Sequence, residues 1–229
     1  MGKLKIIFED NHIIVVEKKP NIPSQSDKTG DMDMLTLVKQ YIKEKYQKPG
    51  NVYLGLVHRL DRPVGGVMIF AKTSKAASRL SNQVREKVFK KKYLAVVDGR
   101  FKEKEGSLED YLYKDERNNI SKVVNKDKKN AKLAKLDYKE LVYNQVKNLS
   151  LLEINLHTGR HHQIRVQLAN AGHSIFGDQK YGKRGQGKQI ALWAYELTIE
   201  HPTTKEMLTF KDLPEPIGTW CILKEVAQL

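Results

Sequence analysis

The chain is poor in cysteine and has no long apolar run. Only one of its 229 residues is cysteine, which excludes an internal disulfide and a cysteine-based metal cage, and we interpret Cys221 as a small apolar filler. No apolar run approaches the length needed to cross a bilayer. The start of the chain lacks the apolar region and cleavage site of a signal peptide, and it lacks the Ser or Thr of a myristoylation signal. These absences predict a cytoplasmic protein with no membrane partner.

Charge of one sign is abundant. Lys and Arg total 41 against 27 Asp and Glu, which gives a formal charge of +14 and a pI near 9.6. Such an excess attracts polyanions, because each neutralised phosphate releases condensed counterions. Lysine-rich surfaces also serve solubility, so the charge favours a nucleic-acid partner without deciding it.

The pattern of apolar residues predicts more strands than helices. Helices are expected from the cap Asp33 to about Tyr46, from the cap Ser74 to about Val88, and over 162–171. Strands are expected at 4–8, 13–17, 52–57, 67–71, 93–97, 136–143, 149–156, 190–200 and 206–210. The lysine-rich stretch 114–139 predicts short strands with mobile connections. No repeat or linker interrupts the chain, so we expect one domain over 1–229, of the α+β class, with a mixed, largely antiparallel sheet and flanking helices.

The first motif is the run His58-Arg-Leu-Asp61-Arg-Pro-Val-Gly-Gly66. It places an acid between two arginines on a turn between strands, where nearby positive charge favours the ionised carboxylate. A turn acid paired with surface arginines explains this segment equally well.

The second motif is Lys90-Lys-Lys-Tyr93, which opens an apolar strand that ends at Asp98-Gly99. Tyrosine stacks on extruded bases, and adjacent lysines follow phosphates. Taken alone, a half-buried strand tyrosine after a solvated charge run is the better interpretation.

The third motif runs from His157 to Gly182 and contains Gly159-Arg160-His161-His162-Gln-Ile-Arg165. Arg160 lies near a helix start, where unpaired N–H groups also favour an anion. The histidines have roughly the spacing of zinc ligands. However, the arginines between them repel a cation, and neither an HExxH motif nor a cysteine pair accompanies them.

Together these segments resemble the RluA-type pseudouridine synthases over nearly the whole chain. The opening Phe8–Pro20 is similar to the family's first strand, and His58–Asp61 to its active-site loop. Its second and third motifs resemble Lys92–Gly99, Gly159–Arg165 and Gly177–Gly182. The resemblance implies the pseudouridine synthase fold with a central catalytic cleft.

Two positions depart from the family pattern. Val64-Gly65 stand where the family commonly has Thr-Ser, and Ser174 follows His173 where proline is common. Both shape loops, so they bear on substrate fit more than on chemistry. Many relatives carry an N-terminal S4 RNA-binding module, and we expect this chain to be the catalytic domain without it.

The resemblance implies an isomerase that converts uridine to pseudouridine in structured ribosomal or transfer RNA. Asp61 is the implied nucleophile, Arg165 the arginine that pairs with it, and Tyr93 the tyrosine that packs on the uracil. Because nothing is oxidised and nothing enters or leaves, no cofactor or metal is required. The residues expected to bind RNA are His58, Arg59, Arg62, Arg160, His162 and Lys180; Arg59 is the candidate to fill the place of the extruded base.

Two other functions remain open from the sequence. An RNA hydrolase that uses Asp61 and the histidines would normally need a metal and several carboxylates. A non-catalytic RNA-binding or chaperone protein would tolerate Asp61→Asn. No obligate protein partner is evident from the sequence.

Overall fold

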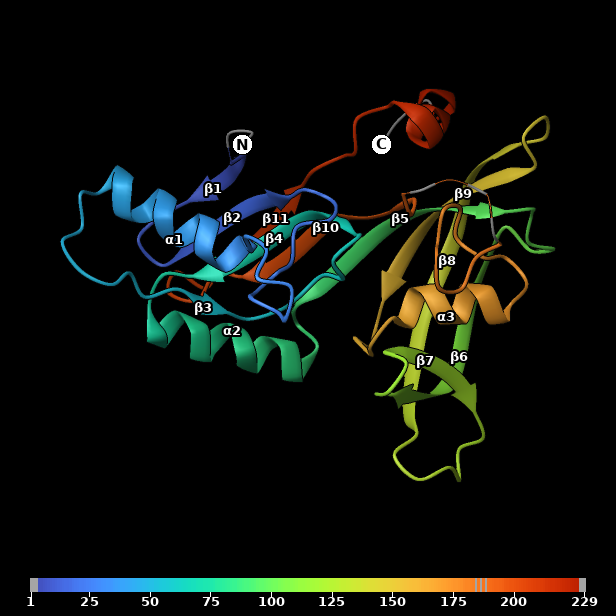
Figure 1. The fold of residues 1–229 in the computed structure, drawn as a ribbon, viewed down its shortest axis with the longest axis horizontal. Helices are drawn as coiled ribbons and strands as arrows, with labels where there is room; N and C mark the ends of the chain where they lie inside the picture. Colours follow the sequence, from blue (N-terminus) through green and yellow to red (C-terminus); the bar gives the residue numbers. More distant parts are fainter. Residues whose placement is uncertain (1–3, 184, 186, 188, 227–229) are drawn as a thin grey trace. The chain divides into compact units, whose positions relative to one another are not determined.

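The computed structural model describes residues 4–183, 185, 187 and 189–226 (Figure 1). The chain divides into two compact units, each built from separated segments: unit 1 comprises Met1–Lys90 with Ala194–Leu213, and unit 2 comprises Lys91–Trp193 with Pro214–Leu229. The single domain expected over residues 1–229 stays a prediction, and each unit is described in turn. None of the helices in the described part of the chain has the length and apolar character of a membrane span.

Unit 1 is a sheet with helices packed on it. Its elements are β1 (Ile6–Glu9), β2 (Ile13–Lys18), α1 (Met34–Lys45), β3 (Gly55–Leu56), β4 (Gly65–Ala71), α2 (Ser74–Glu86), β10 (Leu192–Glu200) and β11 (Met207–Lys211). The strand order is β1-β2-β4-β10, with β11 beside β10 and β3 beside β4. The pairs β1/β2, β2/β4, β3/β4 and β10/β11 are antiparallel.

One core cluster of unit 1 lies between this sheet and α2. Ala76 and Leu80 of α2 pack on apolar side chains of the sheet, among them Ile13, Val15 and Ile69. The opposite side chains of β2 are equally buried, so this strand is covered on both faces. A continuous apolar run is the sequence signature of such a strand.

Unit 2 is a five-stranded antiparallel sheet in the order β5-β9-β8-β6-β7 with one α-helix beside it. Its elements are β5 (Lys90–Asp98), β6 (Glu105–Asp115), β7 (Ile120–Val124), β8 (Lys132–Asn144), β9 (Leu149–Leu156), α3 (Gln163–Asn170) and the 3₁₀ helix η1 (Gly218–Glu225). Helix α3 packs on β6 and β7, and Val166 joins Leu112 and Ala134 in a small core.

Most expected elements are present, and the class, α+β with a mostly antiparallel sheet, is confirmed. Two details differ. Helix α2 is capped by Thr73, whose hydroxyl accepts from Ala76 N at 3.1 Å, and Ser74 is its first helical residue. The eleven-residue strand β6 was not expected. Its inward positions mix polar residues such as Asp110 with apolar ones such as Leu112, so the alternation typical of a strand is weak.

Candidate active-site residues in each unit

The loop 57–64 joins β3 to β4 in unit 1 and carries the half-buried Asp61. Val64 N donates to the carbonyl oxygen of Asp61 at 3.0 Å, which closes a tight turn. The second residue of β4 is Gly66, whose φ is +124° and where a Cβ would lie 2.1 Å from the carbonyl oxygen of Ala194. Only glycine fits this position, so β4 begins at a fixed place beside β10.

A fully buried lysine holds this loop. The ammonium of Lys18 donates to the carbonyl oxygens of Val64 at 2.6 Å, Arg62 at 2.9 Å and Lys19 at 3.3 Å. Burial lowers the pKa of Lys18 to about 7; the negative charge of Asp61 acts in the opposite direction. Lys18 therefore fixes the backbone on the C-terminal side of Asp61 and places a titratable cation near its carboxylate.

The N-terminal side of the loop is held as well. The buried Ser24 hydroxyl donates to the carbonyl oxygen of Leu60 at 2.8 Å and accepts from Leu60 N at 3.1 Å. Neither Lys18 nor Ser24 was singled out from the sequence. The available sequence signal was a lysine two residues after the apolar run Ile13–Val16, within the same strand.

The three residues of this loop expected to bind RNA have different surroundings. His58 Nε2 accepts from the backbone N of Ile69 at 3.1 Å, and its ring packs on Phe89. Arg59 is exposed. Arg62 is also exposed, and its guanidinium contacts the Asp31 carboxylate in the loop before α1. The RNA-binding roles of all three stay predictions.

In unit 2, Tyr93 and Arg165 are both buried. Tyr93 lies on β5, opposite Ile154 of β9. Arg165 lies on α3, and its guanidinium forms a bidentate ion pair with Asp178: Nε to Oδ2 is 2.7 Å and Nη2 to Oδ1 is 2.6 Å. Asp178 was not singled out from the sequence. The expected pairing of Arg165 with Asp61 involves both units and stays a prediction.

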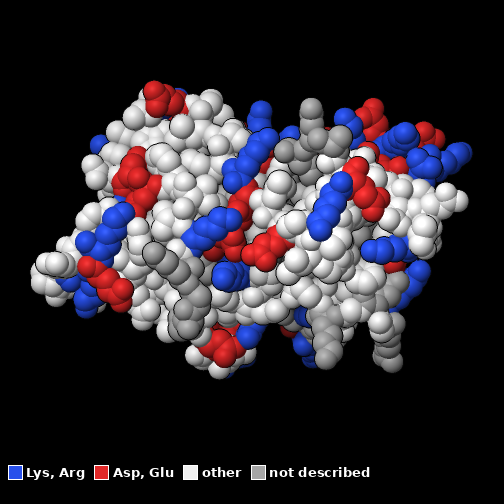
Figure 2. Space-filling model, turned by 90° about the horizontal axis from the view of Figure 1, so that it is seen from above, with Lys and Arg blue, Asp and Glu red and all other residues white. Residues whose placement is uncertain are grey.

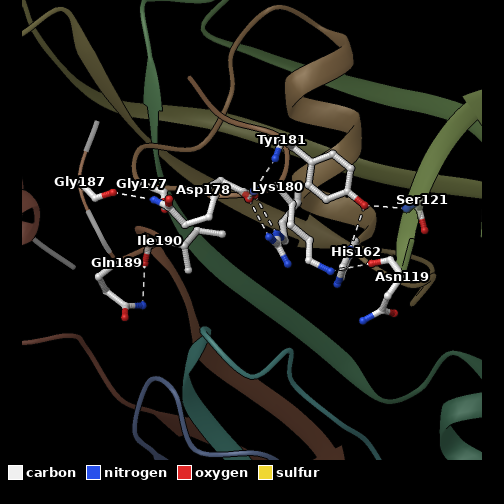
Figure 3. Close-up of polar contacts among 12 residues, drawn as sticks. Asn119, Ser121, His162, Gly177, Asp178, Lys180, Tyr181, Gly187, Gln189 and Ile190 are labelled. Carbon is white, nitrogen blue, oxygen red and sulfur yellow. Dashed lines mark hydrogen bonds and ion pairs between the residues drawn. The ribbon is translucent and has the colours of Figure 1, made fainter. Parts of the chain in front are cut away.

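His162 is a buried, neutral member of the same region (Figure 3). It lies in the left-handed region at φ 53° as the N-cap of α3. Its Nδ1 and the Tyr181 hydroxyl are 2.9 Å apart, and that hydroxyl accepts from Ser121 N at 2.6 Å. Burial, followed by the positive charge of Arg165, lowers the pKa of His162 to about 2.

Arg160 and Lys180 are exposed and anchored by backbone carbonyls. Arg160 Nε donates to Leu133 O at 2.9 Å, and Lys180 Nζ donates to Asn119 O at 2.7 Å. These hydrogen bonds restrict the orientation of both side chains, which are proposed to contact phosphates.

The hairpin segment 114–132 of unit 2 carries an excess of positive charge. It contains seven cations and three acids: Lys114, Arg117, Lys122, Lys126, Lys128, Lys129 and Lys132 against Asp115, Glu116 and Asp127. Two of the acids already face lysines, as in the pairs Lys122–Asp115 and Lys114–Glu116. On the face drawn in Figure 2, by contrast, cations and acids are interspersed.

The histidine spacing that suggested zinc does not gather a ligand set. Within the described ranges, no group of three or more His, Cys, Asp or Glu side chains is placed to hold a metal ion. His157 bonds to Asp137 at 2.5 Å, whereas His161 stacks on His162 and bonds to Ser121.

A family model described as RNA pseudouridylate synthase matches residues 12–170. The chain belongs to the RNA pseudouridine synthase family. It is 33% identical over 211 residues to the uncharacterized RNA pseudouridine synthase YhcT of Bacillus subtilis, covering 90% of this chain and 67% of that protein. It is 30% identical over 239 residues to ribosomal large subunit pseudouridine synthase D of Nitrosomonas europaea, covering 99% of this chain and 66% of that protein. This pseudouridine synthase thus spans about two thirds of the length of those relatives.

Two solved structures have a fold similar to that of this chain. The human RNA pseudouridylate synthase domain containing 1 is 24% identical, with a TM-score of 0.74 over 93% of this chain and 84% of that one. The human protein named RNA pseudouridylate synthase domain containing 4 is 21% identical, with a TM-score of 0.76 over 92% of this chain and 89% of that one. The resemblance found in the motifs is confirmed at the level of family and fold: the family's enzymes are isomerases that convert uridine to pseudouridine in RNA.

Proposed function

We propose that this pseudouridine synthase isomerises uridine in structured ribosomal or transfer RNA, with Asp61 as its nucleophile and with no cofactor or metal. The observation that carries the proposal is the anchored Asp61 loop. Lys18 and Ser24 fix the backbone on either side of the carboxylate through buried hydrogen bonds. A reactive group held in one geometry requires little reorganisation at the moment of reaction. Because RNA is the substrate class of the family, we place the protein in the cytoplasm.

The proposed reaction conserves all atoms of the nucleotide. The N1–C1′ bond breaks, the uracil turns within the site, and C5 bonds to C1′. The proton on C5 leaves and N1 gains one, so no oxidant or reductant takes part. Asp61 either adds to C1′, adds to the uracil ring, or removes a proton from the ribose; a covalent intermediate would divide the difficult step into easier ones.

Arg165 and Tyr93 have supporting roles in this proposal. Arg165 pairs with the Asp61 carboxylate, keeps it charged and orients it. Tyr93 packs on the uracil, and its hydroxyl assists the late proton transfer. The target nucleotide leaves its stack before it reaches Asp61, and Arg59 fills the vacated place.

The remaining RNA contacts divide by chemistry. Arg62, Arg160 and Lys180 are exposed cations suited to phosphates. His162 is neutral because its pKa is about 2, so its proposed contact is a hydrogen bond rather than charge neutralisation. His58 is proposed to support the loop as much as to touch RNA, because its ring already accepts from Ile69 N.

The test is tritium release from RNA labelled at C5 of uridine, using total ribosomal and transfer RNA. Wild type should release tritium and leave the strands intact. Asp61→Asn should abolish release while RNA affinity and circular dichroism stay close to wild type. Cut strands in the product would support a hydrolase instead. Undiminished action of Asp61→Asn would contradict the nucleophile assignment. Pseudouridine mapping in cells with and without the gene then identifies the modified site.

A further inference from the structure

Asp178 and Arg165 form a nearly inaccessible ion pair in unit 2. Their side chains are 0% and 4% exposed, and two parallel N–H···O bonds join them. A guanidinium has five N–H donors in one plane. Because Asp178 binds the Nε and Nη2 edge, it fixes that plane and the direction in which the Nη1 edge points.

Asp178 is itself held by its own turn. Its Oδ1 also accepts from Lys180 N at 2.9 Å and Tyr181 N at 3.2 Å. The turn is closed by Gly182 N, which donates to the carbonyl oxygen of Asp178 at 2.9 Å. On the other side, a Cβ on Gly177 would lie 2.1 Å from the carbonyl oxygen of Gln189. The carboxylate therefore has little freedom to follow Arg165 if the arginine moves.

Tyr181 bounds the guanidinium from another direction. The guanidinium carbon of Arg165 lies 5.3 Å from the centre of the Tyr181 ring. Tyr181 in turn is tied to Ser121 of β7 and to His162 at the start of α3 (Figure 3). These contacts link the turn after Gly177 to both the helix that carries Arg165 and the sheet beneath that helix.

We propose that Asp178 is a positioning residue: it fixes the plane of the Arg165 guanidinium, and the rate of the reaction depends on that orientation. This inference rests on the proposed function, in which Arg165 pairs with Asp61. Asp178 does not touch the substrate, and its whole effect on the reaction passes through Arg165. Loss of Asp178 should therefore slow the chemical step while leaving RNA binding unchanged.

The principal test is Asp178→Asn, which keeps the size of the side chain and removes its charge. The single-turnover rate should fall about tenfold to a hundredfold, as expected for a small misplacement of a reacting group. KM and the RNA dissociation constant should stay within about twofold of wild type. A merely structural role would instead lower the active fraction and leave the rate per folded molecule unchanged.

Two further variants sharpen the result. Arg165→Met combined with Asp178→Asn should be no slower than Arg165→Met alone, because residues that act as a unit are not additive. Glu140→Gln is the matched control: Glu140 is a buried carboxylate of unit 2 that accepts from Arg100 Nε at 3.1 Å and from the Ser150 hydroxyl at 2.9 Å. It should keep the wild-type rate even if its melting temperature falls.

If Asp178→Asn does not fold, Asp178→Glu takes its place, because it keeps the charge and displaces the guanidinium by one methylene. A wild-type rate in the folded variant would overturn the proposal, as would additive losses in the double variant. These outcomes differ from failure of the proposed function, in which wild type itself releases no tritium or Asp61→Asn has no effect.

Discussion

The ammonium of Lys18 lies 2.6 Å from the carbonyl oxygen of Val64 and 2.9 Å from that of Arg62, the residue that follows Asp61 in the chain. A fully buried lysine thus fixes the loop that presents the candidate nucleophile. Burial disfavours the charged form of Lys18 and lowers its pKa to about 7. Its hydrogen bonds to three carbonyls offset part of that cost.

Lys18→Met should reduce turnover by about tenfold or more, because the Asp61 loop loses its anchor and its nearby cation. RNA affinity should change little, since Lys18 is buried. Tritium release under single-turnover conditions measures the effect. Wild-type turnover in the variant would mean that Ser24 and the turn at Val64 hold the loop unaided.

Lys18 should also make stability depend on pH. Its pKa is about 7 in the folded chain, against an ordinary lysine value of 10.5. Between these values the unfolded chain binds more protons, so the contribution of Lys18 to stability rises with pH, by at most about 1.4 kcal/mol per pH unit. Urea unfolding of wild type and Lys18→Met at about pH 7 to 9, within this window, isolates the contribution. Parallel pH curves for the two proteins would contradict it.

Acid should destabilise the protein through His162. Its pKa is about 2 when folded, against an ordinary histidine value of 6.5, so the unfolded chain takes up a proton first as the pH falls. The stability that depends on neutral His162 is present above pH 6.5 and is lost progressively below it. Between about pH 7 and 5, wild type should lose about 2 kcal/mol more than His162→Asn in urea unfolding. Asparagine is the suitable replacement because it tolerates the left-handed backbone. Equal losses in the two proteins would contradict this role of His162.

Gly66→Ala should destabilise unit 1 strongly. The new Cβ would lie 2.1 Å from the carbonyl oxygen of Ala194, at a residue whose φ is +124°. We expect a loss of about 3 kcal/mol or more, from the steric conflict and the strained backbone together. Gly50→Ala is the control, because a Cβ added at Gly50 would have no atom within 4 Å. Chemical denaturation of both variants measures the difference; equal stabilities would show that β4 and β10 can move apart at little cost.

The hairpin segment 114–132 should contribute to RNA affinity through phosphates. Replacing Lys126, Lys128 and Lys129 by glutamine should reduce the slope of log affinity against log salt by about 2 to 3. The single-turnover rate at saturating enzyme should stay unchanged. Lys139→Gln is the control, since Lys139 lies opposite Glu105 on β6 and Glu153 on β9. An unaltered slope in the triple variant would remove this hairpin from the RNA-binding surface.

The sequence predicted elements whose signals are local. The Asp33 cap and the apolar face of α1 are contained within one short segment, and α1 begins and ends close to where they indicate. The hairpin formed by β10 and β11 follows from two alternating runs about a polar turn. Strand β6 was not predicted, because its alternation of apolar and polar residues is weak. Its pairing with β8 depends on residues distant in the chain, as in the pair Ser107 and Asp137.

The candidate site divides in the same way. Asp61, Tyr93 and Arg165 were identified because each stands in a recognisable motif. Asp178 stands in the motif segment Gly177–Gly182 as well, but its role depends on Arg165, which is 13 positions away. Lys18 likewise acts through Val64, across 46 positions. No local pattern reveals such partners.

Ser174 illustrates the same limit at a position that departs from the family motif. Its hydroxyl donates to Asp98 Oδ2 at 3.1 Å, although the two residues are 76 positions apart. The serine therefore has a structural partner that its own segment does not disclose.

The order of segments in unit 1 has a consequence for synthesis. Its sheet contains β10 and β11, yet the segment Lys91–Trp193 of unit 2 is translated between them and the strands they complete. In a nascent chain that has just finished β4, only the two-residue strand β3 covers the edge of β4 that later pairs with β10, until the whole of this segment has emerged. Unfinished strand edges favour wrong association. During synthesis the sheet of unit 1 is therefore completed after the sheet of unit 2, and slow synthesis should expose the edge of β4 to wrong association for longer.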